Sequence, residues 1–338
     1  MAGINGSMAH LSDSIFTTSI AVYAMAMVAY TAEYSFGRRG RIAETAAVEV
    51  PARELVGAGG PPVLSKDAPV VVDVTPTKRP FADKAGRLAI ALTILGALLH
   101  TASISVRAIA VDAVPWSNMY EFASVAGLVG VIAFIAVLWK APSIRHLGAF
   151  ILLPVVLMMF LAGTVLYSRA QKLVPALQSY WLAIHVTLVS IAEGALMTSA
   201  VLTVLYLVKV RYDRKSTAEG YVPGRVGNLA ARLPAADVLD KVSYRIVAFA
   251  FPLYTVAIIC GAIWAEAAWG RYWGWDPKET WAFIVWVIYA CYLHARATAG
   301  FKGKGAAWVN LAGFFSITFN FLIVNIVVSG LHSYAGLS

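Results

Sequence analysis

The stretch YWLAIHVTLVSIAEGALMTSAVLTVLYLV (residues 180–208) decides the fold class. It contains one acidic residue, Glu193, and no Lys or Arg. A transmembrane helix needs roughly 20 predominantly apolar residues, and this stretch is longer than that. Of the 338 residues in the chain, 59% are hydrophobic and 13% are charged, whereas a soluble domain carries about 25% charged residues. The sequence therefore predicts an all-α, polytopic integral membrane protein.

Similar apolar runs recur along the rest of the chain. Together they predict about eight transmembrane helices, at 15–36, 87–109, 122–140, 147–167, 180–208, 245–266, 280–297 and 307–330. The first run is too long and too far along the chain for a cleaved signal peptide, and no basic region precedes it. We expect three parts: an N-terminal transmembrane helix within 1–36, a largely irregular cytoplasmic linker at 37–86, and a seven-helix core at 87–338.

The basic residues are distributed unevenly between alternate loops. If the N-terminus is outside, 22 of the 27 Lys and Arg residues fall in loops predicted to be cytoplasmic. Lys and Arg are retained on the cytoplasmic side of a membrane, so both termini are expected outside. The formal net charge of +9 then reflects topology, and we expect no nucleic-acid partner, only membrane lipid around the helices.

The two cysteines, Cys260 and Cys291, lie inside predicted helices. They form no C-x-x-C pair, so the sequence supports neither a disulfide framework nor a thiol redox motif. It also contains no C-x-x-C-H, so the chain is not itself a c-type cytochrome.

A tryptophan-rich stretch, AWGRYWGWDPKETW (residues 268–281), lies in the outer loop between the sixth and seventh predicted helices. Residues 276–279 form a helix-start signal, which alone would explain Asp276. Trp also collects at membrane interfaces, but four tryptophans separated by glycines suggest a platform on which a flat ligand stacks. Arg271 and Lys278 could hold anionic groups of that ligand. The aromatic candidates are Trp269, Trp273, Trp275 and Trp281.

Two histidines are expected at the depth of the tryptophan-rich stretch. His185 lies five residues after Tyr180, roughly 7–8 Å along its helix from the outer end, and His332 follows the outer end of the last helix. Two imidazoles beside a flat aromatic surface with nearby cations suit a haem with two axial histidines. Two unrelated interfacial histidines remain the alternative.

Other polar residues are predicted inside the membrane. His294 lies about 20 Å further along its helix than Trp281, in the inner half of the bilayer. A ligand role and a helix-to-helix hydrogen bond are equally compatible with that position. His100 could be a second intramembrane ligand, but a packing role is favoured. Glu193 could relay protons or pair with a polar group on another helix, and the sequence does not decide between them.

The last predicted helix carries a polar stripe. Thr318, Asn325, Ser329 and His332 are spaced 7, 4 and 3 residues apart, so they are expected on one helix face. Such stripes usually form interhelical hydrogen bonds, and this one could also orient the ring of His332.

The stretch WGRYWGWDPKETW (residues 269–281) resembles the tryptophan-rich WWD signature of the haem-handling proteins of cytochrome c maturation. The order of His185, this signature, His294 and His332 is similar to that of the CcsA family of system II cytochrome c biogenesis, also called ResC and in some genomes labelled CcsB. PWSNMYEFAS (residues 115–124) is similar to that family as well. The resemblance covers roughly residues 87–335, with the WWD loop at about 264–284.

The resemblance implies a function. In that family haem b enters from the cytoplasmic side and meets an intramembrane histidine, matched here by His294. It then moves to an outer site, where two histidines, matched by His185 and His332, bind the iron. Trp269, Trp273, Trp275, Asp276 and Trp281 match the platform that holds the porphyrin. A C-x-x-C-H peptide of apocytochrome c is joined there to the haem vinyl groups.

The resemblance also implies a partner and a location. A ResB-like membrane subunit supplies the second intramembrane ligand in that family, so a separate partner chain is expected. The protein would be part of a cytochrome c synthase in the bacterial plasma membrane, with its active face outside. Whether any side chain catalyses thioether formation stays open.

Two other functions are compatible with the sequence. A haem exporter would release haem instead of joining it to a peptide. A haem-b electron-transfer subunit usually carries two histidines on the same transmembrane helix, and no predicted helix here carries two.

Overall fold

The structure is a computed structural model. It describes residues 5–36 and 80–332, apart from residues 115, 141, 172–176, 219–220 and 299. These described residues form helices joined by loops, and no strand occurs among them. Most of the linker expected at 37–86 lies outside them, and the helix that follows it starts at Pro80.

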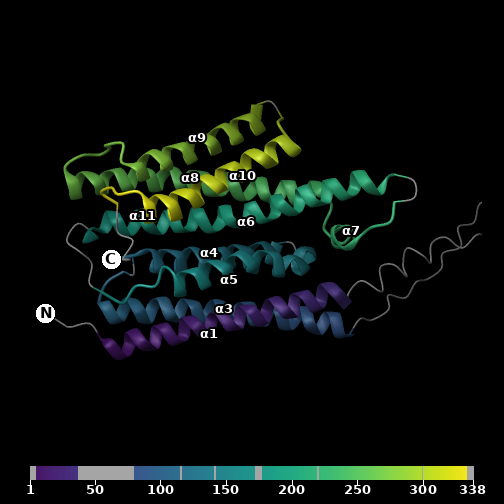
Figure 1. Cartoon of the computed structure of the whole chain (residues 1–338), viewed down its shortest axis with the longest axis horizontal. Coiled ribbons are helices and arrows are strands. Elements are labelled where there is room, and N and C mark those ends of the chain that lie inside the picture. The colour runs from purple at the N-terminus through teal and green to yellow at the C-terminus, as the bar shows by residue number, and fades with distance from the viewer. Residues whose placement is uncertain are drawn as a thin grey trace, which may run out of the picture.

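The long helices run side by side along one axis (Figure 1). They are α1 (Gly6–Phe36), α3 (Pro80–Val111), α4 (Met119–Lys140), α5 (Gly148–Thr164), α6 (Tyr180–Ser216), α8 (Ala236–Trp269), α9 (Pro277–Thr298) and α10 (Lys304–Phe319). Three short elements join them. The 3-10 helix η1 (Pro142–Leu147) precedes α5, α7 (Arg225–Ala230) separates α6 from α8, and α10 continues through a π-helical turn, η3 (Asn320–Val324), into α11 (Asn325–Val327).

Within the described residues, seven helical units are long and apolar enough to cross a membrane: α1, α3, α4, η1 with α5, α6, α8, and the run from α10 to α11. The seventh predicted span, 280–297, corresponds to α9 and is not among them, because aromatic, His and charged side chains interrupt its apolar sequence. It packs against α8 and α10 along the bundle (Figure 1). The chain is thus an all-α, multi-pass membrane protein, which confirms the predicted fold class.

Several helices extend beyond the apolar stretches from which they were predicted. α6 continues past residue 208 to Ser216. Arg214 and Lys215 in its last turn interact favourably with the negative end of the helix dipole. Lys209 also forms an ion pair of 3.0 Å with Asp213 one turn further on, which adds local support. In α6, a basic end therefore continues a helix that hydropathy alone would end earlier.

Small residues allow the helices to approach each other closely. A Cβ atom on Gly194 of α6 would lie 2.7 Å from the carbonyl oxygen of Ala126 and 2.8 Å from the amide nitrogen of Gly130, both in α4. The backbones of the two helices are therefore in direct contact, as is common where small residues line helix interfaces in membranes.

A buried polar cluster joins α6, α8 and α10. The side-chain nitrogen of Asn310 lies 2.7 Å from Thr203 Oγ1, 3.0 Å from Ser199 Oγ and 3.1 Å from Ser243 Oγ. Because hydrogen bonds are directional, this cluster fixes how the three helices are rotated about their own axes.

The start of α1, the α8–α9 loop and the end of α11 lie at the same end of the bundle (Figure 1). We call this end the site end. Asn5, just before α1, donates a backbone hydrogen bond of 3.1 Å to Ala110 near the end of α3, so these two segments also meet there.

Candidate ligand-binding site

A cavity at the site end lies between α4, α6, α8, α9 and the run from α10 to α11. It encloses about 1220 Å³ of empty space, part of which is open to solvent. The lining is mainly apolar. Its polar members are Ser117, Asn118, His185, Glu193, Lys278, Glu279, Asn320, Asn325 and His332.

His185 projects into the cavity from the second turn of α6. Its Nδ1 atom lies 2.7 Å from the carbonyl oxygen of Ala257 in α8. A carbonyl can only accept, so Nδ1 carries the proton and Nε2 keeps its lone pair. A Cβ atom on Gly261 would lie 2.7 Å from both Nδ1 and Cε1 of the ring. Only a glycine at position 261 therefore leaves room for the imidazole against α8.

His332 reaches the same cavity from the turn that follows α11. Its Nδ1 atom lies 3.0 Å from Oδ2 of Asp276, which leaves Nε2 as the atom that can bind a metal. The Asp276 carboxylate also accepts the backbone N–H groups of Leu331, at 2.9 Å, and Lys278, at 3.3 Å. A carboxylate behind a histidine fixes the orientation of a metal-binding ring.

The surroundings of His332, above all its burial, favour its neutral form. Burial lowers the pKa of His332, the nearby Lys278 ammonium lowers it further, and Asp276 only partly offsets these effects. Burial raises the pKa of Asp276, but the hydrogen bonds from Leu331 and His332 outweigh it, so this pKa lies below its ordinary value. A neutral imidazole held by an ionised carboxylate is the form that binds metals.

Trp264 contacts both imidazoles. Its ring is stacked on His185 with a centroid distance of 6.2 Å and meets His332 edge-on at 5.6 Å. Trp269 packs against both Trp264 and His332, at 4.8 Å in each case. Sequence reasoning did not single out Trp264. The available signal was its spacing from Ala257 and Gly261, which places all three residues on the face of α8 that meets His185.

The other tryptophans of the 268–281 stretch take different positions. Trp273 lines the cavity. Trp275 is 66% exposed, has a φ of 58° and packs edge-on against Trp273 at 5.8 Å. Trp281 faces α10, where its ring lies 4.4 Å from that of Phe319. Of these three side chains, only Trp273 is therefore part of the cavity wall.

Arg271 is also turned away from the cavity. Its guanidinium forms an ion pair of 3.6 Å with Glu279 and packs over Gly274. The predicted helix start at 276–279 is confirmed. Glu279 accepts the backbone N–H groups of Gly274, at 2.8 Å, and Asp276, at 3.1 Å, which is the reciprocal half of a capping box. Asp276 thus caps α9 and orients His332 at once.

The polar stripe expected on the last helix does not exist as predicted. The α-helix gives way to the π-helical turn at Asn320, and α11 ends at Val327, before Ser329 and His332. Thr318 instead donates to the carbonyl of Phe314 within its own helix. A π-helical turn changes the angular spacing of the residues, so a stripe read from α-helical spacing fails here.

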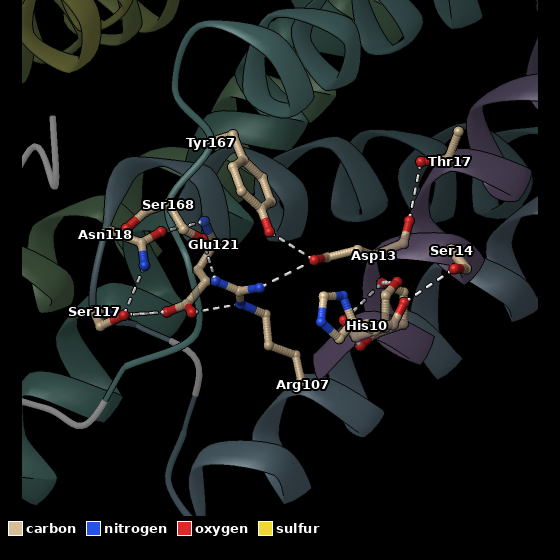
Figure 2. Close-up of polar contacts among 12 residues, drawn as sticks. His10, Asp13, Ser14, Thr17, Arg107, Ser117, Asn118, Glu121, Tyr167 and Ser168 are labelled. Carbon is tan, nitrogen blue, oxygen red and sulfur yellow. Dashed lines mark hydrogen bonds and ion pairs between the residues drawn. The ribbon is translucent and has the colours of Figure 1, made fainter. Parts of the chain in front are cut away.

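A buried network holds the rim of the cavity at the start of α4 (Figure 2). Arg107 of α3 donates to Glu121 at 2.7 Å and to the carbonyl of Ser168 at 2.6 Å, and it forms an ion pair of 3.3 Å with Asp13 of α1. Glu121 in turn accepts the backbone N–H of Ser117 at 2.8 Å. Ser117 lines the cavity, so α1 and α3 position the rim without touching the interior.

The two remaining candidate histidines lie apart from the cavity. His294 is exposed on the surface of α9, and its side chain makes no hydrogen bond within the described residues. His100 is fully buried between the rings of Phe16 and Tyr23, at 5.8 and 6.0 Å, and its Nε2 lies 2.9 Å from Ser124 Oγ. This agrees with the packing role expected for His100.

Comparisons with known proteins give a consistent result. The family described as Cytochrome C assembly protein matches residues 116–332, which include every residue of the cavity lining. The cytochrome c biogenesis protein CcsA of Guillardia theta is 36% identical over 259 residues, covering 73% of this chain and 85% of the relative. CcsA of Gloeobacter violaceus is 35% identical over 283 residues, covering 70% and 83%. The chain therefore belongs to the CcsA family of cytochrome c biogenesis proteins.

Proposed function

We propose that this protein binds haem b in the cavity, with the iron between His185 and His332, and presents it for attachment to apocytochrome c. The observation that carries the proposal is the shared environment of the two imidazoles. One lies on α6 and the other in the turn after α11, far apart in sequence, yet both line one cavity and contact one indole. Each has its Nδ1 atom engaged and its Nε2 atom available.

The residues present fit haem. Its flat, mostly apolar ring suits a cavity lined by Trp264, Trp273 and aliphatic side chains. Neutral histidines are common axial ligands of haem iron. Hydrogen bonds from the ligand rings to a carbonyl and to a carboxylate hold the imidazoles in place and raise their basicity.

When bound, haem would supply two vinyl groups to which cysteine thiols of a C-x-x-C-H peptide add. In each addition the sulfur bonds to one vinyl carbon and the thiol proton ends on the other, so the step consumes no oxidant. On this chain the expected contribution is positional. His185 and His332 would hold the haem at the site end of the bundle, in position for a peptide to reach it.

We infer that the site end lies at the outer face of the membrane and the opposite end at the cytoplasmic face, since the distribution of basic residues favours that orientation. His294 then lies on the surface of α9 in the inner half of the bilayer. Because its ring has no hydrogen-bonding partner in the described chain, it is available to a second membrane subunit. A ResB-like subunit at that surface, with a haem ligand of its own, completes the proposed cytochrome c synthase.

The test is an absorption spectrum combined with a maturation assay. The full chain, purified in detergent after expression with a ResB-like partner, should show a low-spin haem with two imidazole ligands. His185→Gly and His332→Gly should each lose this signature and cytochrome c maturation, and added imidazole should partly restore both. His10→Gly, at an exposed histidine of α1, is the matched control and should change neither.

Two results would refute the proposal. Normal maturation in both cavity variants would remove the imidazoles from the pathway. Binding of haem followed by its release, without transfer to a C-x-x-C-H peptide, would favour an exporter instead.

A further inference from the structure

Lys278 places a positive charge inside the cavity. It belongs to the first turn of α9, and its side chain lines the cavity together with His185 and His332. Its Nζ atom lies 2.6 Å from the side-chain oxygen of Asn325. An ammonium group has three N–H donors. Within the described residues, the ammonium of Lys278 donates no hydrogen bond other than the one to Asn325.

Two amide side chains of the π-helical turn and the residue after it, Asn320 and Asn325, form hydrogen bonds with Lys278. On an ordinary α-helix, two residues five positions apart, such as Asn320 and Asn325, point in directions that differ by roughly 140°. In a π-helical turn the hydrogen bonds join residues five positions apart, so these residues come closer to the same face. Asn320 donates to the backbone carbonyl of Lys278 at 3.3 Å, and Asn325 accepts from its ammonium. Asn325 also donates to the carbonyl of Phe321 at 2.7 Å, which turns its oxygen toward Lys278.

Glu193 of α6 lies across the cavity from Lys278. Among the described lining residues, it carries the only carboxyl group on that side. This side chain is 6% exposed and has no hydrogen-bonding partner in the described chain. The two groups interact electrostatically, as do Lys278 and Asp276, but no salt bridge joins Lys278 to either carboxyl group among the described residues. A buried charge is costly unless it is paired and hydrogen-bonded, so the cavity keeps an ammonium whose pairing is incomplete.

We propose that Lys278, held by Asn325, binds a carboxylate of the ligand and so fixes the rotation of the ligand about its iron. This inference rests on the proposed function, because it takes the ligand to be a haem with two propionate groups. Two axial histidines leave a flat macrocycle free to turn about the line that joins them. One anchored carboxylate removes that freedom and determines which ring edge, and therefore which vinyl groups, faces the opening of the cavity.

The test compares haem b with its dimethyl ester, in which both carboxylates are neutral. Binding of each compound to the full-length protein is measured by optical titration in the same detergent. Wild type should bind haem b more tightly, and Lys278→Gln should weaken haem b by about ten- to a hundredfold, the range of a charge-assisted hydrogen bond. The same variant should leave the ester unchanged, so the ratio of the two affinities approaches one.

The control is Lys241→Gln, the same substitution at a lysine that is 67% exposed on α8 and pairs with Asp237. It should keep the wild-type ratio. Equal binding of haem b and its ester by wild type would overturn the carboxylate anchor, and this comparison needs no variant to fold. That result would leave the proposed function standing if both complexes show two imidazole ligands, whereas the loss of that signature for both compounds in wild type would count against the function itself.

Discussion

At the scale of single residues, Gly261 is as important to the cavity as the histidine that it accommodates. A methyl group at this position would overlap the imidazole of His185 at 2.7 Å, and the ring has no room to retreat while it is bonded to Ala257. We therefore expect Gly261→Ala to rotate His185 out of position. Haem affinity should fall by about ten- to a hundredfold, as for other changes behind a metal ligand, and optical titration would measure it.

The control for this prediction is Gly127→Ala in α4. The nearest atom to a new Cβ there is the flexible end of Met158, at 3.4 Å, which is an ordinary contact. Alanine also favours a helix over glycine by about 1 kcal/mol, so this variant should fold and bind as wild type does. An unchanged affinity in Gly261→Ala would show that the ring of His185 tolerates displacement.

The sequence predicted some of these residues and not others, for a physical reason. His185 and His332 were identifiable because ionisable residues near a membrane need an explanation. Trp264 was not, because an indole in an apolar helix looks like ordinary packing. Nothing in the spacing of the 268–281 stretch indicated that Trp281 faces α10 while Trp273 faces the cavity.

At the scale of elements, Arg107 links α1, α3 and α4 through ion pairs, and its pair with Glu121 is almost entirely buried. Arg107 and Glu121 are each 2% exposed. Removing one partner of such a pair leaves the other charge uncompensated, so Arg107→Met should lower the free energy of unfolding by about 3–5 kcal/mol. Denaturant unfolding in detergent, followed by tryptophan fluorescence, would measure the loss.

The double variant Arg107→Met with Glu121→Met distinguishes lost charge pairing from lost packing. It should be more stable than Arg107→Met alone, because an apolar pair leaves no buried charge. Arg211→Met, at an exposed position of α6, should stay within about 0.5 kcal/mol of wild type. A double variant no more stable than the single one would show that the cost of Arg107→Met does not arise from the unpaired carboxylate of Glu121.

Helix boundaries and helix rotation were unequally predictable. The apolar runs located the spans, but hydropathy underestimated α6, whose basic end continues the helix to Ser216. Rotation about each helix axis could not be derived, because helices surrounded by lipid are apolar on every face and periodicity no longer marks the buried side. The polar stripe on the last helix failed for a related reason, since the π-helical turn interrupts its spacing.

At the scale of the whole molecule, the positions of the histidines suggest a route for haem. His185 and His332 share the cavity at the site end, whereas His294 is exposed on the surface of α9, away from the cavity. If the outer site is filled through an inner one, His294→Ala should reduce haem in the cavity and the yield of mature cytochrome c. Both should be measured per molecule of protein, with the ResB-like partner present.

The control for this variant is Cys291→Ala, which changes an exposed side chain one turn earlier on the same helix and should have no effect. Because the side chain of His294 is exposed, the free energy of unfolding of His294→Ala should stay within about 0.5 kcal/mol of that of wild type. Full haem occupancy and normal yield in His294→Ala would exclude this residue from the route.

The position of Asp276 has a consequence for how the protein is made. Two of the hydrogen bonds to its carboxylate come from Leu331 and His332. The ribosome adds these two residues after every described helix. A nascent chain that stops at Val327 carries every membrane-spanning helix among the described residues, yet it lacks one imidazole and the turn that holds it. Premature termination would thus yield a protein that is inserted in the membrane but cannot bind its ligand. Ligand binding therefore requires that synthesis has continued to residue 332.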